Sequence, residues 1–196
     1  RKNLSPDDAP VGTITEVFKE LSADKNRSLS LGISFPGFID SEKKKVIRSV
    51  WFSQIRGRDL AFEISESCEF RNPIIVERNA ICDITYDYVF KRFRNDALLI
   101  SLVSGVSAAL LVDETILHGK TGNIGELGHL PTAGNYIPCK CVIIGCLETL
   151  VGGAAWGNRW AWETKKRPES FAQSINSSKP ARQIIENSLA LLFSAL

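Results

Sequence analysis

The chain has 196 residues, of which 24 are Lys or Arg and 22 are Asp or Glu, so its formal net charge is only +2. A charge this small does not predict a nucleic-acid-binding surface. Apolar residues make up 44% of the sequence, which is enough for a sizeable core. No apolar run reaches the length of a membrane helix and no signal peptide opens the chain, so a cytoplasmic location is expected.

The first half of the chain predicts alternating helices and strands. Residues 11–21 place apolar side chains three and four positions apart, which predicts an amphipathic helix. The apolar run at residues 29–35 ends in Pro36-Gly37 and predicts a strand followed by a turn. The remaining predicted elements of this half are an extended segment at residues 42–50, a helix at 60–67, a strand at 73–77 and a helix at 80–93.

The second half combines a strand pair with helices. Residues 97–103 and 108–112 predict two strands joined by a turn. Residues 165–180 are polar and are expected to form a loop, whereas residues 181–196 carry a helical apolar stripe. This order of elements predicts a mixed α/β domain.

Residues 122–148 contain one histidine and three closely spaced cysteines: His129, Cys139, Cys141 and Cys146. Imidazole and thiolate are the ligands that zinc prefers, and four of them close a tetrahedral site. A closed site leaves no position for a reacting molecule, so the predicted metal is structural. The alternative is a group of buried free thiols, or one disulfide with a spare thiol.

This segment resembles the zinc-containing signature of the ROK family, whose members are bacterial sugar kinases and sugar-responsive repressors. The family pattern G-E-I/L-G-H appears at residues 125–129, and C-x-C-G-x-x-G-C-L-E appears as CKCVIIGCLE at residues 139–148. Val142 stands where the family usually has Gly, and we expect it to strain the turn without removing a ligand. The resemblance extends from about residue 31 to the end of the chain.

The resemblance implies an α/β fold of the actin-like ATPase (ribonuclease H-like) type, with an incomplete first lobe. Residues 1–72 would be the remainder of that lobe and the crossover, and residues 73–196 would be the second lobe, with a zinc knuckle at 129–146. The opening strands of the first lobe, which carry a phosphate-binding Asp-x-Gly turn in the kinases, are not among these residues. The winged helix of the family's repressors is not among them either.

The family motif also implies that Glu126, His129 and Glu148 contact a sugar. Carboxylates accept hydrogen bonds from sugar hydroxyls, and a histidine with one ring nitrogen on zinc can donate from the other. The residues themselves leave a plainer alternative open. Glu126 could lie in a solvent-exposed loop, and Glu148 could be a first-turn carboxylate of the following helix.

The stretch at residues 76–79 departs from the family's kinases. They carry their catalytic base as the Asp of V-E-N-D, whereas this chain reads Val-Glu-Arg-Asn, so Asn79 occupies a degenerate base position. An amide does not accept a proton at neutral pH, and a positioned base contributes roughly 10²–10⁴-fold to rate. We therefore assign no catalytic residue and expect the chain not to be an enzyme. Asn79 remains a candidate sugar contact.

A second departure lies at residues 103–109, which read VSGVSAA where the kinases have the phosphate loop G-T-G-x-G-x-G. Ser104, Gly105 and Ser107 are the remnant of that loop. Close approach of a backbone to phosphate needs residues without a Cβ and inward N–H groups. An ordinary turn between two strands is therefore the favoured interpretation.

Arg78 stands where the family's kinases carry a sugar-binding Asn. A guanidinium group there could pair with an anionic group, which would make the ligand a sugar phosphate or a sugar acid. The alternative is a salt bridge to Glu77 or Asp83.

These features together predict a sugar- or sugar-phosphate-sensing effector domain of a ROK-type transcriptional repressor, containing structural Zn²⁺. Its DNA-binding module would lie outside these 196 residues. Family members are commonly dimers or tetramers, so a homo-oligomer is expected. One alternative is an ATP- and Mg²⁺-dependent sugar kinase of the glucokinase or N-acetylhexosamine kinase type. Another is a zinc-stabilised scaffold without a ligand.

Two groups of side chains have no assigned chemistry. Cys68 and Cys82 lie far from the knuckle in the sequence and are expected to be small core residues. Trp156, Trp160 and Trp162 follow the knuckle closely. Core packing is expected for most of them, with stacking on a sugar or a subunit contact as the alternatives.

Overall fold

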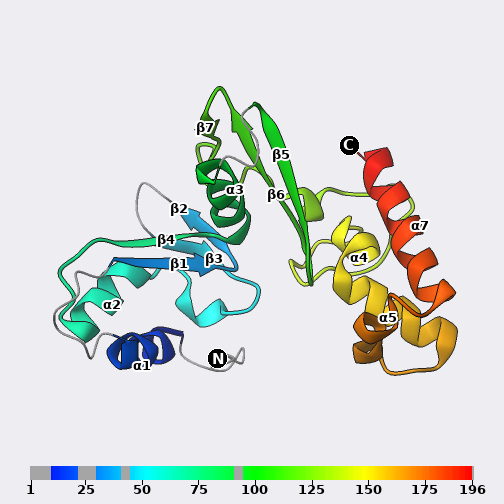
Figure 1. Ribbon diagram of the computed structural model, residues 1–196, viewed down its shortest axis with the longest axis horizontal. Helices are drawn as coiled ribbons and strands as arrows, with labels where there is room; N and C mark the ends of the chain where they lie inside the picture. The colour runs from blue at the N-terminus through cyan, green and yellow to red at the C-terminus, as the bar shows by residue number, and fades with distance from the viewer. Residues whose placement is uncertain (1–9, 22–29, 41–44, 91–94, 196) are drawn as a thin grey trace. The chain divides into compact units, whose positions relative to one another are not determined.

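The computed structural model of the protein describes residues 10–21, 30–40, 45–90 and 95–195 (Figure 1). Contacts between residues divide the chain into two units. Unit 1 comprises residues 1–95 and 112–124, and unit 2 comprises residues 96–111 and 125–196. The units therefore divide elsewhere than between residues 72 and 73, and the assignment of residues 73–196 to a second actin-like lobe stays a prediction.

Unit 1 is built on a pair of parallel strands, β1 and β4, whose register places Leu31 opposite Ile74 and Phe35 opposite Arg78. Helices α1 and α2 lie on one side of this pair (Figure 1). The described elements of the unit are α1 (Pro10–Leu21), β1 (Leu31–Phe35), β2 (Phe38–Asp40), β3 (Lys45–Arg48), α2 (Leu60–Cys68), β4 (Ile74–Arg78), α3 (Asn79–Val89) and β7 (Thr115–Ile116).

The core of unit 1 confirms the apolar patterns of the sequence. The α1 residues Val11 and Ile14 pack against a buried cluster to which α2 contributes Leu60 and Ile64. The side chain of Asp59 caps α2 by accepting a hydrogen bond from the Phe62 N–H at 2.9 Å. Helix α3 ends at Val89, whereas the predicted helix ran to residue 93; residues 91–94 lie outside the described part of the chain.

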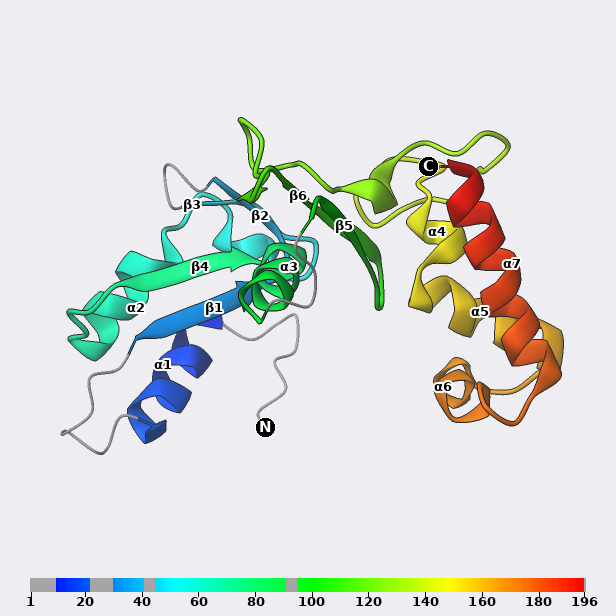
Figure 2. The same cartoon turned by 45° about the horizontal axis from the view of Figure 1, so that its top comes forward.

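Unit 2 begins with the predicted strand pair. Strands β5 (Ala97–Leu102) and β6 (Val106–Val112) form an antiparallel hairpin in which Leu102 lies opposite Val106. Helix α7 (Lys179–Ala195) packs along α4 (Glu148–Val151) and α5 (Gly153–Thr164), as Figure 2 shows. The 3₁₀ turn η2 (Leu127–His129) packs against α4 and positions the predicted site.

The predicted loop at residues 165–180 is partly wrong. It contains a 3₁₀ turn at Pro168–Ser170 and a short helix, α6, at Phe171–Ser174. Phe171 is buried and packs against Trp156 and Trp160. One buried aromatic side chain therefore orders a stretch whose composition predicts a loop.

One expectation about unassigned side chains is confirmed and one is corrected. Most of the three tryptophans pack in the core, as predicted: Trp160 is buried and Trp156 packs with it, whereas Trp162 is 77% exposed. Cys68 and Cys82 are only half-buried.

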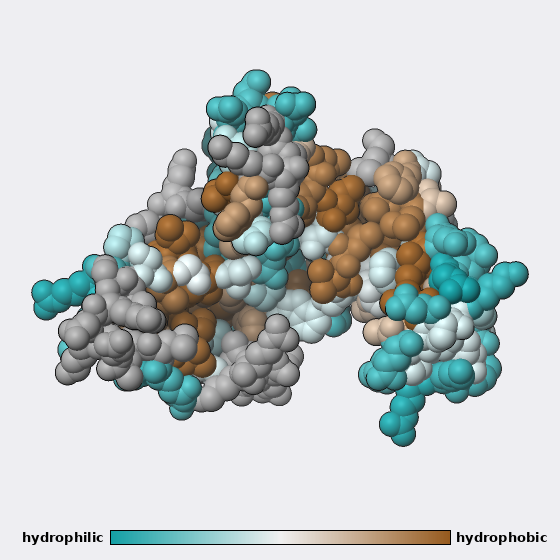
Figure 3. Space-filling model, viewed as in Figure 1, coloured by the Kyte–Doolittle hydropathy of each residue, from teal (hydrophilic) through white to brown (hydrophobic). Residues whose placement is uncertain are grey.

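Figure 3 shows hydrophobic residues gathered on unit 2 over the hairpin and the C-terminal end of α7. Among the exposed apolar side chains of unit 2 are Leu98, Val103, Leu191 and Phe193. None of the helices in the described ranges combines the length and the apolar character needed to cross a membrane.

Candidate functional site

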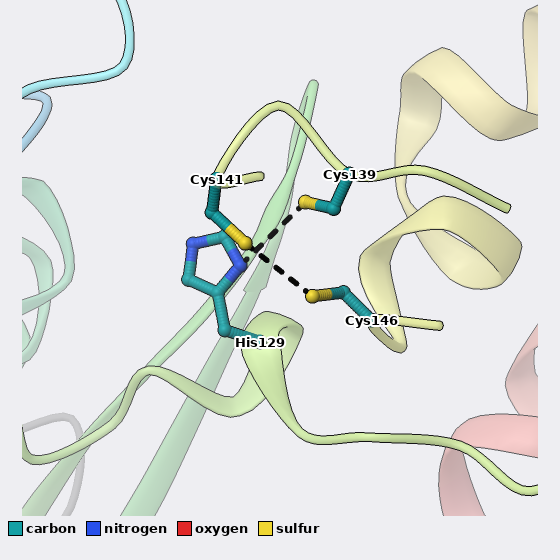
Figure 4. A group of neighbouring side chains, drawn as sticks. All are labelled: His129, Cys139, Cys141 and Cys146. Atoms are coloured by element: carbon teal, nitrogen blue, oxygen red, sulfur yellow. Dashed lines mark hydrogen bonds between the residues drawn. The ribbon is translucent and has the colours of Figure 1, made fainter. Parts of the chain in front are cut away.

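The side chains of His129, Cys139, Cys141 and Cys146 come together in unit 2 and could hold a metal ion (Figure 4). Their ligand atoms all lie within 4.8 Å of one another. The Sγ atoms of Cys141 and Cys146 are 3.5 Å apart, and Cys139 Sγ lies 3.8 Å from His129 Nδ1. Ligand atoms around tetrahedral zinc lie roughly 3.5–3.8 Å apart, given its bond lengths. The donor set therefore fits such an ion, and all five cysteines of the chain are free thiols.

Short backbone contacts shape the knuckle, residues 129–146. The N–H of Cys139 donates to the carbonyl oxygen of Ile143 at 2.9 Å, and the N–H of Val142 donates to the carbonyl oxygen of Cys139 at 2.9 Å. These bonds turn the loop back on itself so that its thiols face Cys146. Two antiparallel bridges close the knuckle: Pro131 with Cys146, and Pro138 with Ile144.

Val142 occupies the left-handed backbone region, with φ at 73°. This region is unfavourable for a β-branched residue, so the predicted strain at this position is confirmed. The side chain is 87% exposed and meets no crowding that would add to the backbone cost. The valine thus keeps the conformation that a glycine would adopt without strain.

Asn135 stabilises the knuckle through buried hydrogen bonds, and the sequence did not predict this role. Its buried amide donates to the carbonyl oxygen of Cys146 at 3.0 Å and to Thr149 Oγ1 at 2.9 Å. Its Oδ1 accepts from the N–H of Ile137 at 3.1 Å. The Gly134-Asn135 pair signals a turn in the sequence, but nothing in that signal indicates a partner eleven positions further on.

Burial raises the pKa of the Cys139 and Cys146 thiols above the usual value for cysteine. Removal from water disfavours the thiolate, and neighbouring groups, Glu148 for Cys139 and Cys141 for Cys146, act in the same direction. A metal that binds as a thiolate complex must therefore displace protons from these groups.

Both predicted sugar-binding carboxylates of unit 2 lie at the Cys/His cluster. Glu126 Oε2 is 3.9 Å from His129 Nε2, the ring nitrogen that does not face Cys139. Glu148 Oε1 accepts a hydrogen bond from the Cys139 thiol at 3.1 Å. The structure therefore brings three of the five candidate sugar-binding residues together: Glu126, His129 and Glu148.

The other two candidates, Arg78 and Asn79, belong to unit 1. Arg78 is buried, and its Nη2 donates to the carbonyl oxygen of Ile124 at 2.7 Å. Asn79 begins α3, and its Oδ1 accepts from Ser34 Oγ at 2.9 Å.

Glu77 faces a partner that the sequence did not suggest. Its Oε2 lies 3.1 Å from His118 Nε2, while His118 Nδ1 lies 3.0 Å from the carbonyl oxygen of Ile116. The Oε1 atom of Glu77 accepts from the backbone N–H of Arg78. Glu77 thus joins the end of β4 to the segment after β7.

Two residues of the phosphate-loop remnant, Ser104 and Gly105, lie in the turn of the β5–β6 hairpin, and the third, Ser107, lies in β6 opposite Ser101. The carbonyl oxygens of Val103 and Ser104 accept hydrogen bonds from the N–H groups of Gly153 and Ala154, at 2.8 and 3.1 Å. The first amides of α5, which would otherwise be available to an anion, are used by the turn itself.

The sequence model of the ROK family matches residues 3–195, and the chain belongs to that family. A glucokinase of Halalkalibacterium halodurans is 32% identical over 132 residues, which are 64% of this chain and 38% of the relative. A xylose repressor of Bacillus subtilis is 26% identical over 152 residues, which are 76% of this chain and 38% of the relative. The chain therefore spans about two fifths of the length of these curated relatives.

The fold is that of solved ROK proteins. The crystal structure of a ROK family transcriptional regulator, a homologue of the Escherichia coli MLC protein, superposes with a TM-score of 0.75 at 22% identity. The match covers 98% of this chain and 53% of the regulator. The mixed α/β fold expected from the resemblance is confirmed. Relatives of both kinds, kinase and repressor, match the chain, so the comparisons do not separate the two functions.

Proposed function

We propose that the chain is the sugar-binding effector domain of a ROK-type transcriptional repressor, with structural zinc on His129, Cys139, Cys141 and Cys146. The observation that carries the proposal is the gathering of Glu126, His129 and Glu148 at the Cys/His cluster. The DNA-binding module would lie outside these residues, and the assembly would be a homo-oligomer.

The proposed ligand site combines two acceptors with one donor. When His129 Nδ1 binds the metal, its Nε2 carries the proton and can donate to a sugar hydroxyl. Glu126 and Glu148 accept from further hydroxyls, and such charge-assisted bonds are the stronger ones. The metal supplies no chemistry at this site beyond holding the knuckle, because its four protein ligands leave no open position.

Two features support binding without turnover. The side chain at the base position, Asn79, is an amide whose oxygen already accepts a hydrogen bond from Ser34. The hairpin turn presents carbonyl oxygens, not amides, to the start of α5. Neither arrangement provides the base or the anion cradle that phosphoryl transfer requires.

The alternative is an ATP-dependent sugar kinase. The sequence identity to the H. halodurans glucokinase, 32%, favours this alternative, because it exceeds the 26% identity to the B. subtilis repressor. In that case ATP and Mg²⁺ would be cofactors.

Calorimetry and thermal shift with glucose, xylose, N-acetylglucosamine and glucose 6-phosphate test the proposal. We expect one neutral sugar to stabilise the chain, by about 2.7 kcal/mol at a concentration of 100 Kd. Because Arg78 is bonded within unit 1, we expect no preference for the phosphorylated sugar. Glu126→Gln should weaken binding by about tenfold or more, since it removes a charged acceptor.

An ADP-release assay with the same sugars separates the two functions. We expect no turnover from the native chain, and none from Asn79→Asp, because the turn at residues 103–109 remains unsuited to phosphate. Sustained sugar-dependent ADP release by the native chain would instead establish the kinase.

A further inference from the structure

Gly105 and Glu148 lie against each other in unit 2. A Cβ atom added to Gly105 would stand 2.6 Å from Glu148 Oε2 and 3.7 Å from Glu148 Cδ. Real Cβ atoms essentially never approach another atom as closely as the first of these distances. The carboxylate therefore fills the space that any other residue at position 105 would occupy.

The backbone does not require glycine at this position. The φ angle of Gly105 lies outside the left-handed region, and no residue from 103 to 109 has a positive φ. A φ angle in this range is open to L-residues. Spatial exclusion by Glu148 is therefore the reason the structure offers for glycine here.

The turn that carries Gly105 is fixed and cannot easily withdraw. Its carbonyl oxygens bond to the start of α5, and the Val103 N–H donates to the Gly105 carbonyl oxygen at 3.1 Å. Glycines at 152 and 153 allow this contact: a Cβ on Gly152 would lie 3.0 Å from the Ser104 oxygen, and one on Gly153 would overlap the Val103 oxygen. A methyl group at position 105 must therefore displace the Glu148 side chain and not the turn.

One further neighbour confines Glu148. Its Oε1 lies 3.1 Å from Cys139 Sγ. Gly128 leaves room for the start of this side chain, because a Cβ there would stand 3.1 Å from Glu148 Cβ. Oε2 of the carboxylate thus lies beside Gly105, and Oε1 lies beside Cys139 of the knuckle.

We infer that Gly105 is a positioning residue for the Glu148 carboxylate in sugar binding, and that it is retained for this contact and not as part of a phosphate loop. The inference rests on the proposed function, because the sugar contact of Glu148 is part of that proposal. Its geometric part, the coupling of residues 105 and 148, can be measured without a ligand.

A double-mutant cycle in urea unfolding measures that coupling. Gly105→Ala should lower the stability of the zinc-loaded chain, whereas the same substitution in a Glu148→Ala background should lower it much less, because the opposing carboxylate is gone. Gly32→Ala is the control, since a Cβ there meets nothing within 4 Å and Gly32 lies in β1, outside any helix that alanine would stabilise. Additive effects of the two substitutions would overturn the inference.

The sugar that binds best then tests the role in recognition. Gly105→Ala should weaken its affinity by about tenfold or more, the loss of one charge-assisted hydrogen bond, while zinc content stays at the native level. Glu148→Asp, whose shorter side chain leaves room for the methyl group, should restore part of the affinity lost in Gly105→Ala.

The outcomes separate the two hypotheses. If the native chain binds a sugar and Gly105→Ala binds it equally well, the role of Gly105 is refuted and the proposed function stands. If the native chain binds none of the sugars, the proposed function fails, and the positioning role in recognition fails with it.

Discussion

The knuckle and the hairpin of unit 2 both carry larger residues where the family resemblance leads us to expect glycine, and their backbones differ. At Val142 the backbone keeps the left-handed conformation, with φ at 73°. At Val103 and Ala109 the backbone has no positive φ. Val103 lies in the turn between two paired strands, and Ala109 lies in β6 opposite Leu99. The knuckle therefore carries backbone strain that the hairpin does not.

Metal binding gives a physical reason for the strained backbone at Val142. Cys139 and Cys141 flank the strained turn, and their thiols must converge with Cys146 and His129 to bind a metal. The energy of metal binding can offset a backbone cost of order 1–3 kcal/mol. Residues 103–109 of the hairpin carry no positive φ, so no comparable backbone cost arises there.

The largest effect is expected from breaking the knuckle. Cys141→Ser should reduce zinc affinity by more than the roughly 10–100-fold that outer-shell substitutions cost. Each 100-fold loss lowers metal-linked stability by about 2.7 kcal/mol. Elemental analysis and thermal unfolding measure both effects, with sugar affinity expected to fall as well. Cys68→Ser, outside the knuckle, should keep its zinc. A Cys141→Ser protein that retains stoichiometric zinc would contradict the proposed ligand set.

An intermediate effect is expected from pH. Because burial raises the pKa of Cys139 and Cys146, both stay protonated in the metal-free chain at neutral pH, and zinc must displace at least these two protons. Apparent zinc affinity should therefore rise by at least about 100-fold per pH unit near neutrality. Competition with a coloured chelator measures the slope, and a flat profile would show that the thiols do not bind the metal.

The metal-free chain should respond to alkali in a defined direction. A thiol whose folded pKa is raised contributes stability that is complete below its ordinary pKa and is lost as pH rises through the raised value. Chelator-treated protein should thus unfold more easily in alkaline solution than at neutral pH. Zinc-loaded protein should lack this loss, because its thiolates are already formed.

The smallest effect sharpens the comparison directly. Val142→Gly should stabilise the chain by about 0.5–1 kcal/mol, since relief of the left-handed strain exceeds the added entropy of glycine. Val103→Gly is the matched variant, because Val103 is also exposed but has no positive φ. It should destabilise by about 0.5–1 kcal/mol. If the urea midpoints of Val142→Gly and Val103→Gly moved in the same direction, the proposed difference in backbone strain between the two positions would be wrong.

Much of the fold could be predicted from apolar periodicity. The patterns at residues 11–21, 60–67 and 181–196 correspond to α1, α2 and α7, and the strand pair at 97–112 is a hairpin. Local patterns could not predict α6, because its order depends on burial of Phe171 against tryptophans of α5. The division into units was also inaccessible, since it depends on contacts between distant segments.

The sequence predicted the metal ligands of the candidate site but not the residues that hold those ligands and Glu148 in place. Cysteine spacing and the family motif indicated the four residues that the structure brings together. The roles of Asn135 and Gly105 depend on partners far along the chain, Cys146 and Glu148, and no short pattern encodes such distances. The pairing of His118 with Glu77 was missed for the same reason.

The confinement of the knuckle, both acidic groups and Gly105 to unit 2 has an evolutionary consequence. Under the proposed function, the sugar contacts of unit 2 can be inherited together while the rest of the polypeptide diverges. Asn79, at the proposed base position, belongs to unit 1. A sugar-modifying protein and a sugar-reporting one could then differ at position 79 and still share the contacts that unit 2 provides.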